Sequence, residues 1–232
     1  MSEAINDLDQ VIANQQRAKV TYINADCLNK AFVDRNYFEV IKQSERIFPD
    51  GTGVNIAAKM TKQVMVDNIN GTDMFPELCQ LAEERGYSMY FLGAKPGTTD
   101  NLVENLRERF PKLNIAGHQH GYFDNNATEQ VINDINASNA SLLFVAMGAP
   151  AQENWINKHF EQLNCNILLA VGGLFDFNSG NIPRAPLFIR KIGMEWVWRL
   201  LQEPGRMWRR YIIGNPLFLY RVLRHGKNMP KG

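Results

Sequence analysis

Apolar residues in the first ninety positions of the chain alternate between two spacings. Over residues 3–16 they recur every three or four positions, which is the spacing of one face of a helix. Residues 18–24 form a short apolar run, which is typical of a buried strand. The alternation continues, and we expect further helices over residues 26–43, 53–60 and 72–86. Two more strands are expected over residues 46–53, which run into a Pro-Asp-Gly turn, and over residues 88–93.

The strand pattern is strongest in the second half of the chain. The segments SLLFVAMG (141–148) and NILLAVGG (166–173) are apolar almost throughout, and residues 114–121 begin as a strand. Helices are expected from the loop at 94–98 to about Phe110, and over residues 126–137 and 149–163. Strands that are apolar on both sides need cover on both faces, which indicates a parallel sheet in a Rossmann-like α/β sandwich.

Ligands of such sheets bind beyond the carboxyl ends of the strands, where the following loops open. We therefore expect one binding edge, formed by the loops at residues 24–26, 49–53, 93–98, 148–152 and 172–184.

The composition changes near Pro183. After it, residues 186–202 and 205–225 are predicted as two amphipathic helices separated by Glu203-Pro204-Gly205. From Arg184 onward eleven Lys or Arg residues face two acidic ones, so this part carries a net charge of +9 although the whole chain carries +1. We predict a Rossmann-like catalytic domain over residues 1–185 and a basic helical appendage over 186–232, whose charge favours phosphate-bearing partners.

The remaining composition excludes several classes of protein. Hydrophobic residues make up 45% of the chain and charged residues 21%, as in ordinary globular domains. The three cysteines lie far apart without a CxxC pair, so a disulfide framework or zinc site is not expected and a reducing cytoplasm fits. We see no signal peptide and no apolar run near the roughly 20 residues of a membrane-spanning helix.

Two polar residues at strand ends are candidates for chemistry. Asp50 lies between Pro49 and Gly51, where its carboxylate could take a proton from a hydroxyl group; alternatively it is a turn residue that caps the helix beginning near Gly53. Asn24 follows the first strand and could bind a sugar hydroxyl or cap the next helix.

Three glycine-containing loops follow predicted strands. We take Gly93, Gly148, Gly172 and Gly173 as substrate-binding candidates, because exposed backbone amides at a helix start suit a diphosphate. The first loop lacks the P-loop pattern, and all of these glycines could simply form turns. Gln152 could bind a uracil or sugar edge, or face solvent.

Neither metal-like motif predicts a metal site. His118 and His120 place both rings on one face of a strand, but no acidic or thiol partner stands near them in the sequence. The pair Asp7 and Asp9 lies on the first helix, where we expect a solvated face. Without a metal, cations or helix dipoles would have to stabilise a leaving diphosphate.

The appendage combines arginines with tryptophans. Trp196, Trp198 and Trp208 lie among four arginines, Arg199, Arg206, Arg209 and Arg210. This combination suits an anionic membrane interface and also nucleic-acid phosphates, while the simplest alternative is a helix packed on the body with solvated charges.

Seven segments together resemble the WecG/TagA/CpsF glycosyltransferases, glycosyltransferase family 26. They are IFPDGTG, NGTDMF, YFLGAKPG, HGYF, LLFVAMGAPAQENWI, AVGGLFDFNSG and RAPLFIRKIGMEWVWRLLQEPGRMWRR, in the family order. The resemblance implies an inverting, metal-independent transferase without a cofactor. It would move N-acetylmannosamine, its uronic acid or glucose from a UDP-sugar to an undecaprenyl-diphosphate-linked acceptor in cell-surface polysaccharide synthesis.

The resemblance also implies roles for individual residues. Asp50 matches the catalytic base, Asn24 and Gln152 match binding residues, and the matching arginines of the appendage are Arg199, Arg206 and Arg209.

At two positions the residue differs from the one found in some members of the family, so the resemblance alone does not define which donor or acceptor this chain uses. This chain has Tyr22 where some have Thr, and Asn68 where some have Arg; both are candidates for substrate binding.

The expected partners follow from this resemblance: the UDP-sugar, the lipid-diphosphate-linked acceptor, an anionic membrane surface and a second copy of the chain, but no nucleic acid. The expected location is the inner face of the cytoplasmic membrane, with peripheral attachment. An oxidoreductase is the main alternative, yet Gly51-Thr52-Gly53 is followed by Ile56 where the dinucleotide fingerprint needs Gly or Ala. A nucleic-acid-binding protein is the alternative that uses the basic appendage.

Overall fold

The computed structural model describes residues 1–63 and 68–226, and its centre is one parallel sheet of six strands. The order across the sheet is β2-β1-β6-β5-β3-β4, and every neighbouring pair is parallel. The strands are β1 (Ala18–Ile23), β2 (Arg46–Pro49), β3 (Ser88–Gly93), β4 (Asn114–Gln119), β5 (Leu142–Ala146) and β6 (Ile167–Ala170). This arrangement confirms the expected Rossmann-like α/β architecture.

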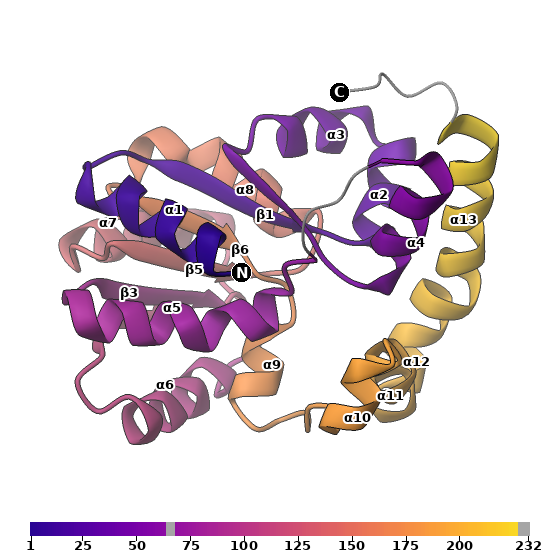
Figure 1. Cartoon of the computed structure of the whole chain (residues 1–232). Helices are drawn as coiled ribbons and strands as arrows, with labels where there is room; N and C mark the ends of the chain where they lie inside the picture. Colours follow the sequence, from indigo (N-terminus) through magenta and orange to yellow (C-terminus); the bar gives the residue numbers. More distant parts are fainter. Residues whose placement is uncertain (64–67, 227–232) are drawn as a thin grey trace.

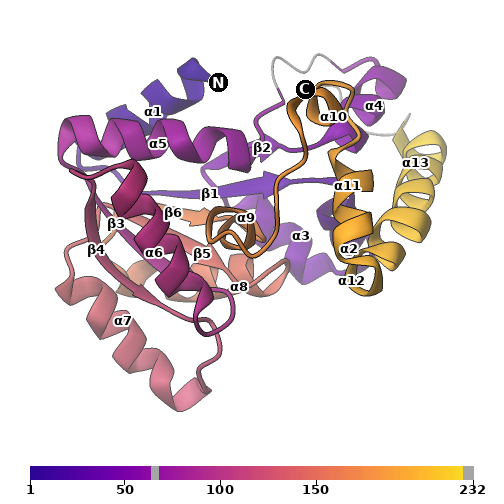
Figure 2. The same cartoon turned by 90° about the horizontal axis from the view of Figure 1, so that it is seen from below.

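Helices cover both faces of the sheet (Figures 1 and 2). One face is covered by α1 (Ser2–Ala13), α5 (Gly71–Arg85) and α6 (Thr98–Arg109), and the other by α7 (Thr128–Ala137) and α8 (Ala151–His159). Successive strand residues alternate between the two cores: Phe91 packs with Phe75 on the first side, while Leu92 packs on the second. Short 3-10 turns, η1 (Asn125–Ala127) and η2 (Phe160–Gln162), flank α7 and α8.

The helix expected over residues 26–43 is two helices, α2 (Ala25–Val33) and α3 (Arg35–Lys42). Asp34 breaks it, because its backbone is extended and its carboxylate accepts a hydrogen bond from the Tyr37 amide at 3.1 Å. Aspartate is a preferred N-cap, so the local side-chain hydrogen bond overrides the continuous apolar spacing.

The C-terminal part is helical, but its first predicted helix is wrong in extent. Residues 186–202 form α10 (Leu187–Lys191) and α11 (Glu195–Gln202), separated at Gly193, whose φ of +74° ends the first. The break before Pro204 is confirmed, and α12 (Pro204–Trp208), the π-helical turn η3 (Arg209–Ile213) and α13 (Gly214–His225) follow. The short α9 (Leu174–Asn178) lies between β6 and this part.

The appendage returns to the sheet domain through α13. Phe218 and Val222 pack against Ala25 of α2, with Ala57 of α4 (Thr52–Thr61) beside them. Asn29 also donates a hydrogen bond to the Gly214 carbonyl at 2.7 Å. These contacts place the appendage across the carboxyl ends of β1 and β2 (Figure 1). The domain boundary at residues 185 and 186 stays a prediction.

Both metal-like motifs have partners that the sequence did not reveal. Asp7 forms an ion pair with Arg46, and Asp9 accepts hydrogen bonds from Arg85 at 2.9 Å and from Tyr87 at 2.7 Å. Both carboxylates remain partly exposed to solvent on the face where we expected them, and each is also paired with a basic side chain of another element.

His118 has the acidic partner that the sequence seemed to lack: its Nε2 lies 3.0 Å from Asp100. Within the described residues, no group of three or more potential metal ligands is present, and no helix is long and apolar enough to cross a membrane.

Candidate active site

Two adjoining cavities lie between the appendage and the sheet, beyond the ends of β2, β1, β6 and β5. The first has a volume of about 590 Å³ and the second about 690 Å³, which is the size range of small-molecule sites. Seven residues border both: Asn24, Asp26, Asp50, Thr72, Phe177, Arg199 and Arg210. Asp50 and Asn24 thus lie where the two cavities meet.

Asp50 follows β2 directly and is held by its backbone. Its amide donates to the Ile23 carbonyl at 2.8 Å, and the next residue, Gly51, has a φ of +90° and precedes α4. No side chain caps α4, so the alternative that Asp50 is a helix cap is wrong. The Oδ1 atom of Asp50 is buried without a hydrogen-bond partner. A carboxylate oxygen that lacks a hydrogen-bond donor and belongs to a residue bordering a cavity is suited to receive a proton from a bound ligand.

The surroundings of Asp50 favour its protonated form. The pKa of this carboxyl is raised to about 6, mainly by burial; Arg210 opposes the change, Glu195 and Asp73 add to it, and Arg199 also opposes it. A base whose pKa lies near neutral pH both accepts and releases a proton readily. The appendage therefore places charges of both signs near the carboxyl that would act as the base: those of Glu195, Arg199 and Arg210.

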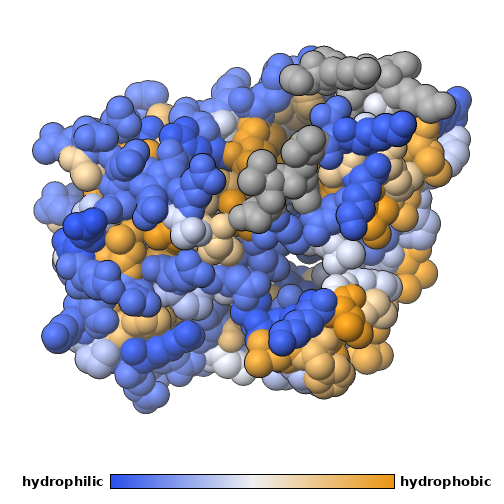
Figure 3. Space-filling model, in the orientation of Figure 1, coloured by the Kyte–Doolittle hydropathy of each residue, from blue (hydrophilic) through white to orange (hydrophobic). Residues whose placement is uncertain are grey.

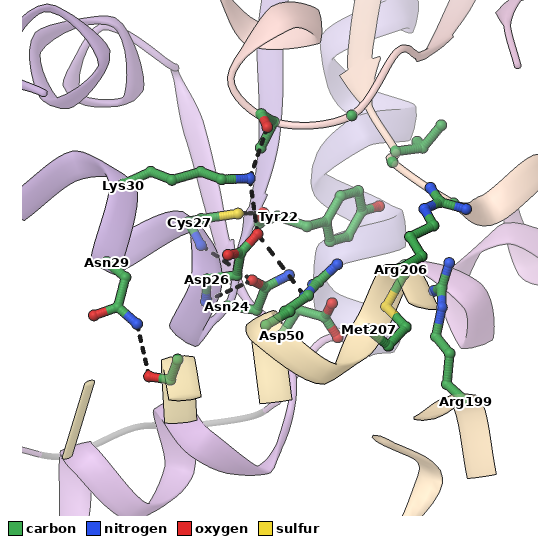
Figure 4. A pocket seen from close by; sticks show the side chains of 18 of the residues that line it. Tyr22, Asn24, Asp26, Cys27, Asn29, Lys30, Asp50, Arg199, Arg206 and Met207 are labelled. Carbon is green, nitrogen blue, oxygen red and sulfur yellow. Dashed lines mark hydrogen bonds and ion pairs between the residues drawn. The ribbon is translucent and has the colours of Figure 1, made fainter. Parts of the chain in front are cut away.

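Asn24 and Tyr22 lie at the end of β1 beside Asp50 (Figure 4). The Asn24 oxygen caps α2 by accepting from the amides of Asp26 and Cys27 at 3.1 and 3.2 Å, so only its amide nitrogen is left for a ligand. Tyr22 is buried, and its hydroxyl donates to Met74 Sδ at 3.1 Å. The ring borders the first cavity and so reduces the space that a ligand could occupy there.

Asn68 supports the turn that carries Asp50. Its Oδ1 atom accepts a hydrogen bond from the Gly51 amide at 3.0 Å, and its side chain borders the second cavity only. The contact with a ligand that we expected for Asn68 stays a prediction.

Gln152 joins two of the glycine loops. Its Oε1 atom accepts from the amides of Gly148 at 3.1 Å and Gly172 at 2.9 Å. Both glycines have positive φ angles, +79° and +57°, and both border the first cavity with Gln152. Gln152 is only 4% exposed, so the alternative of a solvent-facing side chain is wrong.

Arg199 and Arg206 reach into the first cavity from the appendage (Figure 4). The Arg199 guanidinium lies against Gly173, where an added Cβ would come within 2.4 Å of it, and 4.7 Å from the centre of the Phe177 ring. Arg206 donates to Glu203 at 2.9 Å and lies 3.4 Å from Asp176. The absence of a side chain at Gly173 therefore makes room for a cation.

Arg209 and Arg210 complete the positive border of the site. Arg209 borders the first cavity only, whereas Arg210 borders both and has its Nε atom 3.9 Å from the carboxylate of Asp26. Sequence reasoning did not select Arg210 for the site. Neighbouring residues of a helix point in different directions, so the sequence did not show that Arg209 and Arg210 both border the first cavity.

Gly93 ends β3 but borders neither cavity, unlike the other glycines expected to bind substrate. An added Cβ would lie 2.4 Å from the Ala146 carbonyl oxygen, and the φ of Gly93 is +134°. Its structural role is close packing of β3 against the end of β5. None of residues 94–98 borders either cavity, although we expected their loop at the binding edge.

We expect Gly93→Ala to lower the free energy of unfolding by roughly 3 kcal/mol or more, because a side chain fits neither the space nor the φ angle. Thermal denaturation measures this. Gly97→Ala is the control, since Gly97 has a φ of +84° but open space around it, and should cost about 1 kcal/mol. Equal losses in the two variants would contradict the packing role.

The chain is similar to known proteins over its whole length. Residues 1–232 match the family described as Glycosyl transferase WecG/TagA/CpsF. The chain is 32% identical over 211 residues to a protein of Bacillus subtilis strain 168, covering 91% of this chain and 81% of that relative. It is 30% identical over 233 residues to a protein of Staphylococcus aureus strain MW2, covering 100% and 90%. Both relatives are named N-acetylglucosaminyldiphosphoundecaprenol N-acetyl-beta-D-mannosaminyltransferase.

The chain belongs to the WecG/TagA/CpsF glycosyltransferase family and is a glycosyltransferase. The oxidoreductase and nucleic-acid-binding alternatives are therefore set aside.

Proposed function

We propose that this enzyme transfers N-acetylmannosamine from its UDP derivative to the N-acetylglucosamine of a diphosphoundecaprenol-linked acceptor, with inversion and with Asp50 as the base. One observation carries the proposal: a buried carboxylate oxygen without a partner lies where two cavities meet, bordered by arginines of the appendage. The relatives' names supply the sugar and the acceptor.

The first cavity suits the donor. It is bordered by the glycine loops after β5 and β6 and by four arginines of the appendage, Arg199, Arg206, Arg209 and Arg210. Cations placed around a leaving diphosphate stabilise the charge that develops as the glycosidic bond breaks. In this proposal they do so without a metal ion.

The second cavity suits the acceptor. Its border is mainly apolar and includes Ile56 of α4 and Trp196, Tyr211 and Phe218 of the appendage. A sugar attached to a lipid diphosphate needs a polar end near the base and an apolar exit toward the lipid. The cavity offers both, since Asp50 lies at one end and Ile56 is 40% exposed.

The transfer then needs one proton movement. The acceptor hydroxyl oxygen attacks the anomeric carbon of the donor from the face opposite to UDP, and its proton passes to Asp50. The bond from the anomeric carbon to the diphosphate oxygen breaks with its electron pair leaving on UDP. Attack opposite to the leaving group inverts the configuration at that carbon, which matches the beta linkage in the relatives' names.

The appendage also presents a surface suited to an anionic membrane. Figure 3 shows hydrophobic side chains gathered over α10–α12 and along α13. The exposed apolar residues here are Leu187, Phe188, Ile192, Met194, Leu201, Trp208, Ile212, Ile213, Leu217, Tyr220 and Leu223. Apolar side chains among basic ones bind an interface where anionic head groups meet acyl chains. We infer peripheral attachment to the inner face of the cytoplasmic membrane, where a UDP-sugar and a lipid-linked acceptor meet.

Trp208→Ala should weaken binding to vesicles that contain anionic lipid by roughly tenfold, because the 43% exposed ring would be buried at the interface. Vesicle co-sedimentation measures this, and transfer to a water-soluble acceptor should change much less. Tyr122→Ala is the matched control, since Tyr122 is 67% exposed on the loop after β4. An equal loss of vesicle binding in both variants would contradict the role of the appendage.

The rate of transfer should depend on pH through Asp50. The raised pKa of about 6 means that the carboxylate, which is the active form, is lost as the pH falls through about 6. We expect kcat/KM to be level above pH 7 and to fall about tenfold per pH unit below about 5.5. A profile that stays level down to pH 4.5 would show that no group with this pKa acts in transfer.

A panel of UDP-sugars tests the proposal as a whole. Each is incubated, with and without EDTA, with a short-chain lipid-diphosphate-N-acetylglucosamine, and the glycosylated lipid is detected by mass spectrometry. The proposal expects product from UDP-N-acetylmannosamine in both conditions. If product formed only from another UDP-sugar, the proposed donor sugar would be wrong. If EDTA abolished product formation, the proposal that transfer needs no metal ion would be wrong.

A further inference from the structure

A buried polar pair stands at the start of α8: Gln152 borders the first cavity and Glu153 does not, and neither has a part in the chemistry proposed above. Gln152 and Glu153 are 4% and 3% exposed. The Gln152 amide nitrogen donates to Glu153 Oε1 at 2.9 Å. Burying a carboxylate is unfavourable unless its hydrogen bonds compensate for the lost solvent. Glu153 itself borders neither cavity, so a direct contact with substrate does not explain its burial.

The orientation of the Gln152 amide matters for the shape of the site. Its oxygen accepts from the amides of Gly148 and Gly172, and so joins the loops that end β5 and β6. An amide oxygen only accepts hydrogen bonds and an amide nitrogen only donates them. If the Gln152 amide were turned over, its NH₂ group would face two further donors and both loops would lose their common partner.

Glu153 is placed to prevent that reversal. An ionised carboxylate only accepts hydrogen bonds, so it selects the orientation in which the Gln152 nitrogen points toward it. Tyr37, which is completely buried on α3, lies beside Glu153, although neither its hydroxyl nor Glu153 Oε2 makes a hydrogen bond of ordinary geometry. Lys30 fixes the preceding loop by donating to the Ala149 carbonyl at 2.8 Å (Figure 4).

We propose that Glu153 is a positioning residue: it holds the Gln152 amide so that the oxygen joins Gly148 to Gly172 and sets the form of the donor-binding edge. This inference rests on the proposed function, because it takes the first cavity as the site of the UDP-sugar.

The test is the dissociation constant of UDP, measured by isothermal titration calorimetry on the full chain. Gln152→Met and Glu153→Met should each weaken UDP binding roughly tenfold, the effect of losing a buried hydrogen-bond partner. If Glu153 acts through Gln152, the double variant should bind no more weakly than either single variant. Glu153→Gln keeps an acceptor oxygen and should stay within about twofold of the unchanged protein. Glu129→Met, on the exposed side of α7, is the matched control and should change nothing.

Either of two results would overturn the inference: additive losses in the double variant, or a loss with Glu153→Gln as large as with Glu153→Met. If Glu153→Met fails to fold, Gln152→Glu gives the same test without a change in side-chain length. That substitution alone sets two carboxylates against each other and should weaken UDP binding. Adding Glu153→Gln restores every donor–acceptor pair and should recover most of the affinity, and no recovery would overturn the inference.

The two proposals fail in different ways. If the unchanged protein does not bind UDP, the donor site of the proposed function is wrong and this inference falls with it. If the unchanged protein binds UDP and Glu153→Met binds it equally well, only the role of Glu153 is wrong.

Discussion

Asp50→Asn should reduce the rate of transfer by about 10²–10⁴-fold while leaving the fold and UDP binding nearly intact. The amide cannot take the proton of the acceptor hydroxyl, and general-base catalysis is typically worth that factor. Because the pKa of Asp50 is raised to about 6, the carboxylate is still its main form at pH 7, but this charge is less stable in the folded protein than in the unfolded chain. Removing the charge should therefore leave the free energy of unfolding at pH 7 unchanged or slightly higher.

Single-turnover transfer, UDP titration and thermal denaturation of the same variant separate these effects. Asp73→Asn is the matched control, because Asp73 borders the second cavity but its Oδ1 atom pairs with Arg184 at 2.6 Å. It should lower the rate far less than Asp50→Asn does. Turnover near that of the unchanged enzyme in folded Asp50→Asn protein would remove Asp50 from the mechanism.

Loss of the appendage should have the second large effect. Deleting residues from Ile189 onward removes Arg199, Arg206 and Arg209 from the first cavity, and we expect transfer to fall by more than about 10³-fold. Release from anionic vesicles should accompany this loss, since each basic residue near such a surface contributes about 1 kcal/mol. The release from vesicles depends on the membrane, whereas the loss of transfer does not.

Arg206→Ala separates catalysis from membrane attachment. Assayed in detergent with a soluble acceptor, it should lower kcat by about 10²-fold, because a cation beside the leaving diphosphate is lost. Arg224→Ala is the control: Arg224 lies on α13, pairs with the Tyr220 hydroxyl at 2.9 Å and borders neither cavity. If the truncated protein transfers sugar to the soluble acceptor at the full-length rate, the appendage is only an anchor.

Much of the fold could be predicted because strand and helix spacing differ clearly in this chain. The strands β5 and β6 are uninterrupted apolar segments, and their burial on both faces follows from that pattern. The divisions within helices could not be predicted from spacing. Asp34 ends one helix and begins the next through a side-chain hydrogen bond, and Gly193 ends another with a left-handed φ. The spacing of apolar residues gives no information about either the Asp34 hydrogen bond or the φ angle of Gly193.

The candidate site was predictable where a residue's place follows from the end of a strand. Asp50 and Gly172 lie at the shared edge for that reason alone. Gly93 also lies at the end of a strand, but there the backbone of β3 packs against Ala146, and the sequence does not show how closely two backbones approach.

Arg210 was not predicted because neighbouring residues of a helix point in different directions, whereas here Arg209 and Arg210 both border the first cavity. The partner of Asn68, the Gly51 amide, likewise depends on how two distant loops meet.

The configuration of the product tests the central claim most directly. The enzyme is incubated with UDP-N-acetylmannosamine and a short-chain lipid-diphosphate-N-acetylglucosamine, and the new glycosidic linkage is assigned by NMR. Single displacement with Asp50 as base predicts a beta-linked disaccharide from the alpha-linked donor, formed by the unchanged enzyme and nearly absent with Asp50→Asn. An alpha-linked product, or equal amounts of product from both proteins, would contradict this mechanism.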